Sequence, residues 1–340
     1  MKSDRILVLQ LKRIGDLILT APALADLRRA RPEAEVVLVT GPRLRDLGQC
    51  LPGVDQVIEY RAPLGSAAAW TQALWGDWEA VLDFSGTDRS ALMTALTRAP
   101  LRIGYRKFSG GGLRRRAYTR LSQASVRDLH TVDFHRALVA EAVGEPSGQG
   151  GDEPLLRLPE TVVVAASEKA RAAGLEGAFA VIHPGTARRE KFWPVERWVT
   201  VARAVVEAGL QVVLTGTGSG LEEEDVRQLR QQTEVPVVDL TSRLTLPELA
   251  ALIRQADLAL GVDSMAMHLA ALWRRPQVVL FGPTNPFHWR PRHESARVVT
   301  AVQSGGQQTF HARDKGADMN LISTDAVLSA IQSLRLAGRL

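Results

Sequence analysis

Short apolar runs, each followed by a turn and a helix-forming segment, recur along the whole chain and constrain its fold most. In the first part they predict strands at Arg5–Leu11, Glu35–Thr40, Gln56–Tyr60 and Ala80–Phe84. In the second part they predict strands at 179–183, 211–215, 235–239, 258–262, 277–281 and 297–300. Strands that alternate with helices form right-handed βαβ units, so the pattern predicts an α/β protein with doubly wound parallel sheets.

A linker signal divides the chain into two predicted domains. The stretch 144–159, GEPSGQGGDEPLLRLP, is rich in Gly and Pro and has no apolar periodicity. Because 340 residues suffice for two domains, we expect Rossmann-like domains at 1–150 and 160–340. A helix at 131–143 closes the first, and a last helix at 324–336 is free to pack back on it. The Arg- and Gly-rich stretch 102–120 is interpreted as a mobile basic loop.

Composition is that of an ordinary globular protein, with 45% hydrophobic and 23% charged residues. The single cysteine, Cys50, excludes an internal disulfide and fits a reducing compartment. The chain has no apolar run of the roughly 18 to 20 residues that span a bilayer, and its start reads as a strand rather than a signal peptide. We therefore expect a cytoplasmic protein. The net charge of +5 reflects either genome composition or attraction to a phosphorylated ligand or anionic membrane.

The stretch Asp257–Trp273 predicts an anion site. A buried strand ends on Asp263 and Ser264, an N-cap pair for the helix that follows. Free N–H groups and the helix dipole at such a start favour a phosphate. His268, one turn into the helix, is interpreted with equal weight as a ligand contact or a structural histidine. The next strand runs into Gly-Pro-Thr-Asn-Pro, 282–286, and should border the same crevice.

Two further loops follow predicted strands. In His183–Pro194, Gly185 permits close backbone approach, Thr186 offers a hydroxyl and Lys191 a cation for a leaving diphosphate, whereas Trp193 is expected to pack in the core. After the first strand, Asp16 is either a general base or the N-cap of the next helix. Pro22 either lies in the first turn of that helix, with Thr20 as N-cap, or kinks it.

These motifs together resemble glycosyltransferase family 9, the ADP-heptose:lipopolysaccharide heptosyltransferases. The resemblance rests on the opening LKRIGDLILTAPAL, Gly-Thr…Lys-x-Trp-Pro at 185–194, DSMAMH at 263–268, FGPTNP and DMNLI at 318–322. It implies a GT-B fold, with two Rossmann-like domains whose sheets face a central cleft. Two residues depart from the family motif: Ser264 replaces Thr, and Met265 replaces Gly. Met265 therefore leaves two alternatives, an ordinary helix start or a partly blocked phosphate pocket.

The resemblance implies an inverting enzyme that transfers heptose from ADP-L-glycero-D-manno-heptose to a lipopolysaccharide core acceptor, without a metal or other cofactor. It assigns Asp16 as the base and Lys191 as the stabiliser of departing ADP. Glu222 would bind the ribose or cap a helix, and Leu244 would contact adenine or simply pack. The donor residues it implies are Gly185, Thr186, Glu222, Leu244, Asp263, Ser264, Met265 and His268.

Acceptor contacts are expected in the first domain, from Lys12, Arg13, Arg114, Arg115 and Arg116, with peripheral contact to the inner membrane. Two alternatives stay open: a transferase of the same fold that uses another nucleotide sugar, and a non-catalytic nucleotide-sugar binder. The basic stretch also carries interleaved aromatic residues, but no nucleic-acid-binding module surrounds it. Nucleic acid is therefore not an expected partner.

Overall fold

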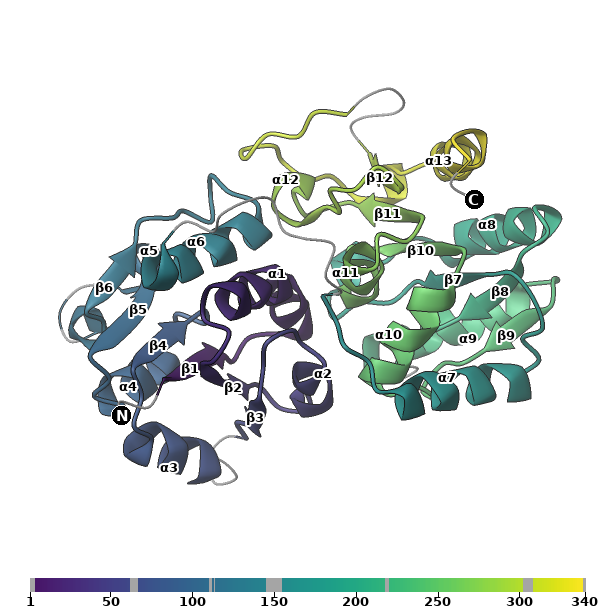
Figure 1. Cartoon of the computed structure of the whole chain (residues 1–340). Coiled ribbons are helices and arrows are strands. Elements are labelled where there is room, and N and C mark those ends of the chain that lie inside the picture. Colours follow the sequence, from purple (N-terminus) through teal and green to yellow (C-terminus); the bar gives the residue numbers. More distant parts are fainter. Residues whose placement is uncertain are drawn as a thin grey trace. The chain divides into compact units, whose positions relative to one another are not determined.

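The computed structural model describes residues 4–61, 67–109, 112, 114–144, 155–217, 220–301 and 308–338. The chain forms two compact units, Met1–Arg157 and Leu158–Leu340, coloured purple to blue and teal to yellow in Figure 1. The division falls inside the Gly- and Pro-rich stretch that the sequence marks as a linker.

The first unit is built on a six-stranded parallel sheet of order β3-β2-β1-β4-β5-β6. Its strands are β1 (Arg5–Gln10), β2 (Glu35–Thr40), β3 (Gln56–Glu59), β4 (Ala80–Asp83), β5 (Leu101–Tyr105) and β6 (Arg120–Ser122). Its helices are α1 (Ile14–Ala30), α2 (Arg45–Gln49), α3 (Ala67–Trp75), α4 (Asp88–Leu96), α5 (Arg106–Ser109), η1 (Arg114–Ala117) and α6 (Thr131–Val143).

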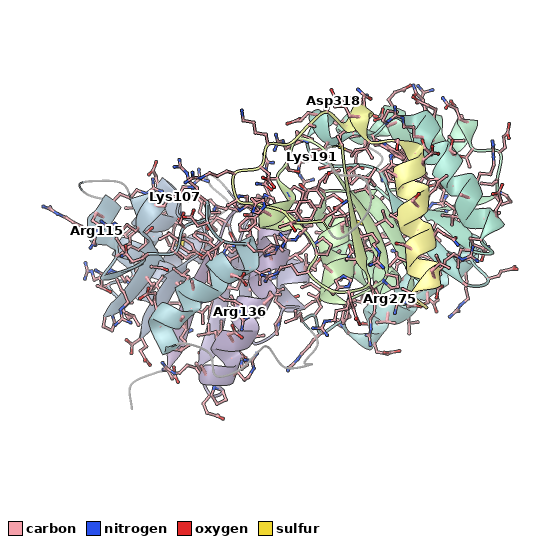
Figure 2. The ribbon with its side chains drawn as sticks, turned by 90° about the horizontal axis from the view of Figure 1, so that it is seen from above. Lys107, Arg115, Arg136, Lys191, Arg275 and Asp318 are labelled. Carbon is pink, nitrogen blue, oxygen red and sulfur yellow. The ribbon has the colours of Figure 1, made fainter. Side chains whose placement is uncertain are left out.

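Residue alternation along β1 assigns the helices to the two faces of this sheet. Leu7 and Leu9 join one core cluster with residues of α3 and α4. Gln10 points to the other face, where its amide donates to Thr20 of α1 at 3.0 Å. Helices α1 and α6 pack against each other, and Arg136 of α6 (Figure 2) holds Asp26 of α1 at 2.5 Å.

In the first unit one prediction is wrong, and one of two alternatives is excluded. The stretch 102–120 is not simply a loop, since it contains most of β5, the short helices α5 and η1, and the start of β6. Gly104 is needed there because Tyr118 packs on it: a Cβ at Gly104 would lie 2.4 Å from the Tyr118 ring. Helix α1 begins at Ile14 with Arg13 as N-cap, so Thr20 is not its N-cap and Pro22 lies inside the helix.

The second unit repeats the architecture with strand order β12-β11-β10-β7-β8-β9, again all parallel. Its strands are β7 (Phe179–His183), β8 (Gln211–Leu214), β9 (Val237–Asp239), β10 (Leu258–Val262), β11 (Gln277–Phe281) and β12 (Ala296–Thr300). Its helices are α7 (Glu160–Ala172), η2 (Arg189–Lys191), α8 (Val195–Glu207), η3 (Gly220–Glu222), α9 (Glu223–Gln232), α10 (Leu246–Gln255), α11 (Met265–Leu272), α12 (Pro286–Trp289), η4 (Met319–Leu321) and α13 (Thr324–Leu336).

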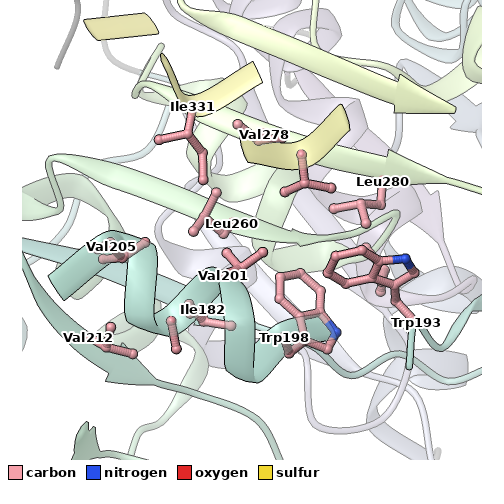
Figure 3. Packing of buried hydrophobic residues seen from close by; sticks show 14 of the residues in the cluster. Ile182, Trp193, Trp198, Val201, Val205, Val212, Leu260, Val278, Leu280 and Ile331 are labelled. Atoms are coloured by element: carbon pink, nitrogen blue, oxygen red, sulfur yellow. The ribbon is translucent and has the colours of Figure 1, made fainter. Parts of the chain in front are cut away.

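A large apolar cluster fills one side of the second sheet (Figure 3). Trp193 and Trp198 meet edge to face in it, with ring centroids 4.9 Å apart, and the Trp193 indole donates to the Ile322 carbonyl at 3.0 Å. The predicted core role of Trp193 is confirmed. The buried residues of α13 belong to the same cluster, and this helix packs on α8, β11 and β12 of its own unit.

Both sheets have the strand order of a doubly wound nucleotide-binding fold, in which ligands bind where the order reverses. The reversal lies between β1 and β4 in the first unit and between β7 and β10 in the second. The functional residues are therefore sought in the loops after these four strands. Among the described residues, none of the helices is long and apolar enough to cross a membrane.

Candidate active site

A buried ion pair occupies the switch point of the second unit. The Lys191 ammonium, from η2 after β7, donates to Asp263 Oδ2 at 2.7 Å, and Asp263 ends β10. The side chains are only 13% and 6% exposed. Thr284, in the loop after β11, donates its hydroxyl to the same carboxylate oxygen at 2.7 Å. Three neighbouring strand ends thus hold one lysine (Figure 2) in a fixed position.

His268 lies beside this pair as a neutral side chain. Its Nε2 is 3.9 Å from Asp263 Oδ1, and the ring is buried. Burial lowers the pKa of His268, Asp263 opposes the shift, and Lys191 adds to it. An imidazole that is neutral near pH 7 does not form an ion pair with Asp263. The structure therefore places His268 at the site, where it can serve as a neutral hydrogen-bonding group.

Ser264 is a candidate ligand contact, because its hydroxyl is buried and has no hydrogen-bond partner. It occupies the predicted N-cap position of α11, but its side chain makes no capping hydrogen bond. The first N–H groups of a helix lack intrahelical partners. A buried hydroxyl, a helix N-terminus and Lys191 therefore converge on one place, which is the arrangement that a phosphate requires.

Met265 is the first residue of α11 and is partly buried. The non-glycine residues with positive φ in the described chain are Arg43, Arg98, Ser242 and Arg274. Met265 is therefore in ordinary right-handed helical geometry, so the helix start needs no glycine. The backbone at this position is therefore that of an ordinary helix start, and whether the Met265 side chain narrows the phosphate pocket stays a question for experiment.

We expect Met265→Gly to change the affinity for ADP by less than about tenfold, or about 1.4 kcal/mol, because a right-handed helix start needs no glycine. Isothermal titration calorimetry of both proteins measures this change. Absence of ADP binding in the parent chain together with clear binding in the variant would show that Met265 blocks the pocket.

Glu222 lies where the loops after β7 and β8 meet. Its Oε2 accepts the Thr217 amide at 2.8 Å, and the carboxylate is buried. It occupies the N-cap position of α9 without a side-chain capping bond. A Cβ at Gly185 would lie 2.2 Å from Glu222 Cδ. The close approach predicted at Gly185 is thus made by Glu222 itself.

His183, which the sequence did not single out as a site residue, is buried at the end of β7. Its Nδ1 lies 3.0 Å from the Thr215 hydroxyl. Burial lowers the pKa of His183, and Glu222 opposes this shift. Thr186 and Leu244 are partly exposed, and their predicted donor contacts stay hypotheses.

Gly185→Ala is expected to lower the free energy of unfolding by about 1 to 3 kcal/mol, the usual cost of overpacking, because Glu222 must move. Urea denaturation of Gly185→Ala, Glu222→Ala and the double variant gives the coupling energy. If Glu222 causes the clash, Gly185→Ala costs little in the Glu222→Ala background. Additive effects would place the clash elsewhere.

The switch point of the first unit carries Asp16, the third residue of α1. It lies in the first helical turn, and the N-cap is Arg13. The Asp16 carboxylate accepts hydrogen bonds from the backbone of Arg13 and of Asp16 itself, so it also caps the start of α1, and its role as a base stays a prediction. Burial raises the pKa of the Asp16 carboxyl, and the nearby positive charges of Lys12 and Arg13 oppose that shift. A carboxylate made more basic by burial has the property that a general base needs.

A second buried carboxylate, Asp83, ends β4 and was not predicted as a site residue. It accepts the Ser85 and Gly86 amides, each at 2.9 Å, and the Tyr118 hydroxyl at 2.7 Å. Burial raises the pKa of Asp83, and these bonds oppose the shift. With all these donors fixed on it, Asp83 anchors the loop that follows β4 and the segment around Tyr118.

Three of the four predicted acceptor arginines lie in η1, beside α4, and the fourth, Arg13, is the N-cap of α1. Arg114 pairs with Asp88 at 3.0 Å and also bonds the Gly86 carbonyl. Arg115 (Figure 2) and Arg116 are exposed. Arg114 is therefore engaged in holding η1 on α4, whereas the other two present their charge to solvent.

In the part of the chain that the structure describes, three or more His, Cys, Asp or Glu side chains do not gather anywhere as a metal-binding group. The cation at the candidate phosphate position is Lys191.

Comparison with known proteins identifies the family of the chain that carries this site. The model described as "Glycosyltransferase family 9 (heptosyltransferase)" matches residues 68–319. The chain belongs to this family. A lipopolysaccharide heptosyltransferase 3 of Escherichia coli (strain K12) is 25% identical to it, over 94% of this chain and 95% of that protein.

Solved structures of glycosyltransferase family 9 have the same fold. The glycosyl transferase family 9 structure from Veillonella parvula DSM 2008 superposes with a TM-score of 0.82 at 25% identity, covering 99% of both chains. The Escherichia coli heptosyltransferase WaaC with ADP-2-deoxy-2-fluoro heptose gives 0.73 at 23% identity, over 97% of this chain and 99% of that one. The predicted family and fold class are confirmed.

Proposed function

We propose that this family 9 glycosyltransferase moves a heptose from ADP-L-glycero-D-manno-heptose to a core sugar of lipopolysaccharide, with inversion at the anomeric carbon. The observation that carries the proposal is the buried Lys191–Asp263–Thr284 cluster beside the unpartnered Ser264 hydroxyl at the start of α11. The names of the relatives support the sugar: the matched proteins include lipopolysaccharide heptosyltransferases 1, 2 and 3.

The donor is assigned to the second unit. As the bond between the anomeric carbon and the β-phosphate oxygen breaks, its electron pair leaves with ADP, so negative charge grows on the diphosphate. Lys191 and the N–H groups of α11 stabilise that charge. Asp263 is itself an anion and would repel phosphate, so its role is to orient Lys191. Glu222 is assigned to the ribose, because a buried carboxylate can accept hydrogen bonds from the ribose hydroxyls.

The acceptor is assigned to the first unit. Asp16 takes the proton of the acceptor hydroxyl while the oxygen forms its bond to the anomeric carbon. Lys12 and Arg13 attract the anionic core sugars and phosphates of the acceptor. Because that acceptor is a lipid, the enzyme works peripherally on the cytoplasmic face of the inner membrane. The ADP-heptose donor reaches it from the cytoplasm.

A donor panel tests the proposal. The purified chain is incubated with ADP-heptose, ADP-glucose and UDP-GlcNAc, with and without truncated lipopolysaccharides, and nucleotide release is measured. We expect ADP release with ADP-heptose that depends on the acceptor. Faster turnover of another nucleotide sugar, or ADP binding without any transfer, would refute the assigned reaction.

A further inference from the structure

Three large apolar side chains of the first unit are exposed to solvent on adjacent helices. Trp75, at the end of α3, is 77% exposed, and Leu92 and Leu96 of α4 are 54% and 37% exposed. Leu92 and Leu96 are four residues apart, so they lie on one side of their helix. Helices α3 and α4 pack against each other on the same face of the sheet (Figure 1). We call these three exposed side chains, carried by two helices that pack side by side, the apolar strip.

Four exposed arginines lie on α4, just after it or on η1, which packs against α4. Arg89 belongs to α4, Arg98 follows it, and Arg115 and Arg116 lie in η1, and all four are exposed. The one acidic residue of α4, Asp88, is paired with Arg114 at 3.0 Å. Asp77, just after α3, is an exposed acid near Trp75 in the sequence. The positive charges outnumber the negative ones, so the strip has a basic border.

The basic border is held rigidly on α4. Helix η1 packs against α4, and Ala91 of α4 shares a small core cluster with Ala117 and Tyr118. The Tyr118 hydroxyl donates to the buried Asp83 at 2.7 Å. These contacts fix Arg115 and Arg116 beside the apolar strip, so that the two parts act as one surface. We call α3, α4 and η1 with these side chains the α3–α4–η1 face.

We propose that the α3–α4–η1 face binds the surface of an anionic lipid bilayer. Trp75, Leu92 and Leu96 would enter the headgroup boundary, and the arginines would contact lipid phosphates. Exposed apolar side chains bordered by basic ones are typical of surfaces that lie on a membrane without crossing it. Charge complementarity selects this partner: a second copy of the chain would bring the same arginines against each other. This inference rests on the peripheral membrane location in the proposed function and adds the surface that makes the contact, and it can be tested without the transfer reaction.

Because the native Cys50 thiol is buried, a cysteine introduced at the surface can be labelled selectively. Cys50 is 3% exposed, and burial raises the pKa of its thiol to about 11, so it stays protonated and unreactive near pH 7. In Leu92→Cys, a maleimide fluorophore sensitive to polarity would label the introduced cysteine. We expect a blue shift on adding vesicles of phosphatidylethanolamine and phosphatidylglycerol. Vesicles of phosphatidylcholine alone should give little shift.

A matched control comes from the second unit. Leu321 is 65% exposed and lies three residues after Asp318, outside any basic cluster in the sequence. The same label at Leu321→Cys should give no shift with either vesicle, although the protein is bound. An equal shift at both positions would mean that the chain adsorbs without a preferred face, which overturns the proposal.

Flotation assays separate the apolar and basic contributions. An exposed arginine near an anionic surface contributes on the order of fivefold in partitioning, so Arg115→Ser/Arg116→Ser should weaken vesicle binding roughly 20-fold and flatten its salt dependence. Trp75→Ser/Leu92→Ser should weaken binding roughly tenfold or more at every salt concentration. The latter variant should keep full activity on a soluble, delipidated acceptor, because none of its changes touches the site.

Two results would overturn the proposal. One is unchanged vesicle binding in both double variants. The other is concentration-dependent self-association of the parent chain, seen by sedimentation, that Trp75→Ser/Leu92→Ser abolishes without changing vesicle binding; the face would then join copies of the chain. Failure of heptose transfer leaves all of these readouts unaffected, so the two proposals fail independently.

Discussion

We expect Asp16→Asn to abolish transfer and to leave the affinity for the ADP donor within a few-fold of the parent. An amide keeps the size of the side chain but cannot take a proton, and a general base contributes about 10²- to 10⁴-fold to a rate. The acceptor hydroxyl, and not ADP, is its partner, so donor binding should survive. ADP release in the presence of acceptor measures the first effect, and calorimetry with ADP measures the second.

Asp26→Asn is the matched control in the same helix. Asp26 is buried and paired with Arg136 at 2.5 Å, so its loss should lower the free energy of unfolding and leave kcat unchanged. If Asp16→Asn retains substantial acceptor-dependent activity, Asp16 is not the base.

The pH profile gives an independent readout of the same residue. Burial raises the pKa of Asp16 and Lys12 opposes the shift. The active form is ionised, so activity is present above this pKa and falls as the pH drops through it. Lys12→Met removes a positive charge that favours the carboxylate, so the acid limb of kcat should move to higher pH. A limb that stays in place would mean that it reports another group.

Much of the fold could be predicted from the sequence because buried parallel strands consist of continuous runs of apolar residues. The strands Phe179–His183, Leu258–Val262 and Gln277–Phe281 have the predicted bounds. Strand β5 was missed because Leu101 and Ile103 alternate with Arg102 and Gly104, in a stretch dominated by arginine. What makes that stretch a strand is tertiary packing, above all Tyr118 against Gly104, which no local pattern encodes.

The candidate site was predictable where residues follow strands and harder to predict where they meet across the chain. Ser264 and His268 are predictable as candidates because they lie at a helix start and one turn into that helix, whereas Lys191 is a candidate chiefly through the motif Gly-Thr…Lys-x-Trp-Pro. The bond from Lys191 to Asp263 joins residues 72 positions apart, and no local pattern indicates that Asp263 holds a cation. Thr284 was seen only as part of a turn, and its bond to Asp263 depends on the order of strands β10 and β11.

Lys191→Ala is expected to lower kcat/KM for the sugar donor. The loss should correspond to about 2 to 4 kcal/mol of transition-state stabilisation, the cost of losing one hydrogen-bond donor to developing negative charge. The variant should also be less stable, because Asp263 would keep a buried charge with its cation removed, and breaking such a pair costs about 3 to 5 kcal/mol. Activity alone would therefore not separate chemistry from folding. Steady-state kinetics must be paired with urea denaturation.

The double variant Lys191→Met/Asp263→Asn separates the two effects. It removes both charges, and the asparagine oxygen can still accept the Thr284 hydroxyl, which donates to Asp263 at 2.7 Å in the parent. We expect its free energy of unfolding to return toward that of the parent. Its activity should stay low, because the positive charge that Lys191 offers to the leaving diphosphate is not replaced. EDTA should not alter the parent rate. Recovery of activity in the double variant, or strict dependence on an added divalent metal, would show that Lys191 supports the fold and that another group stabilises departing ADP.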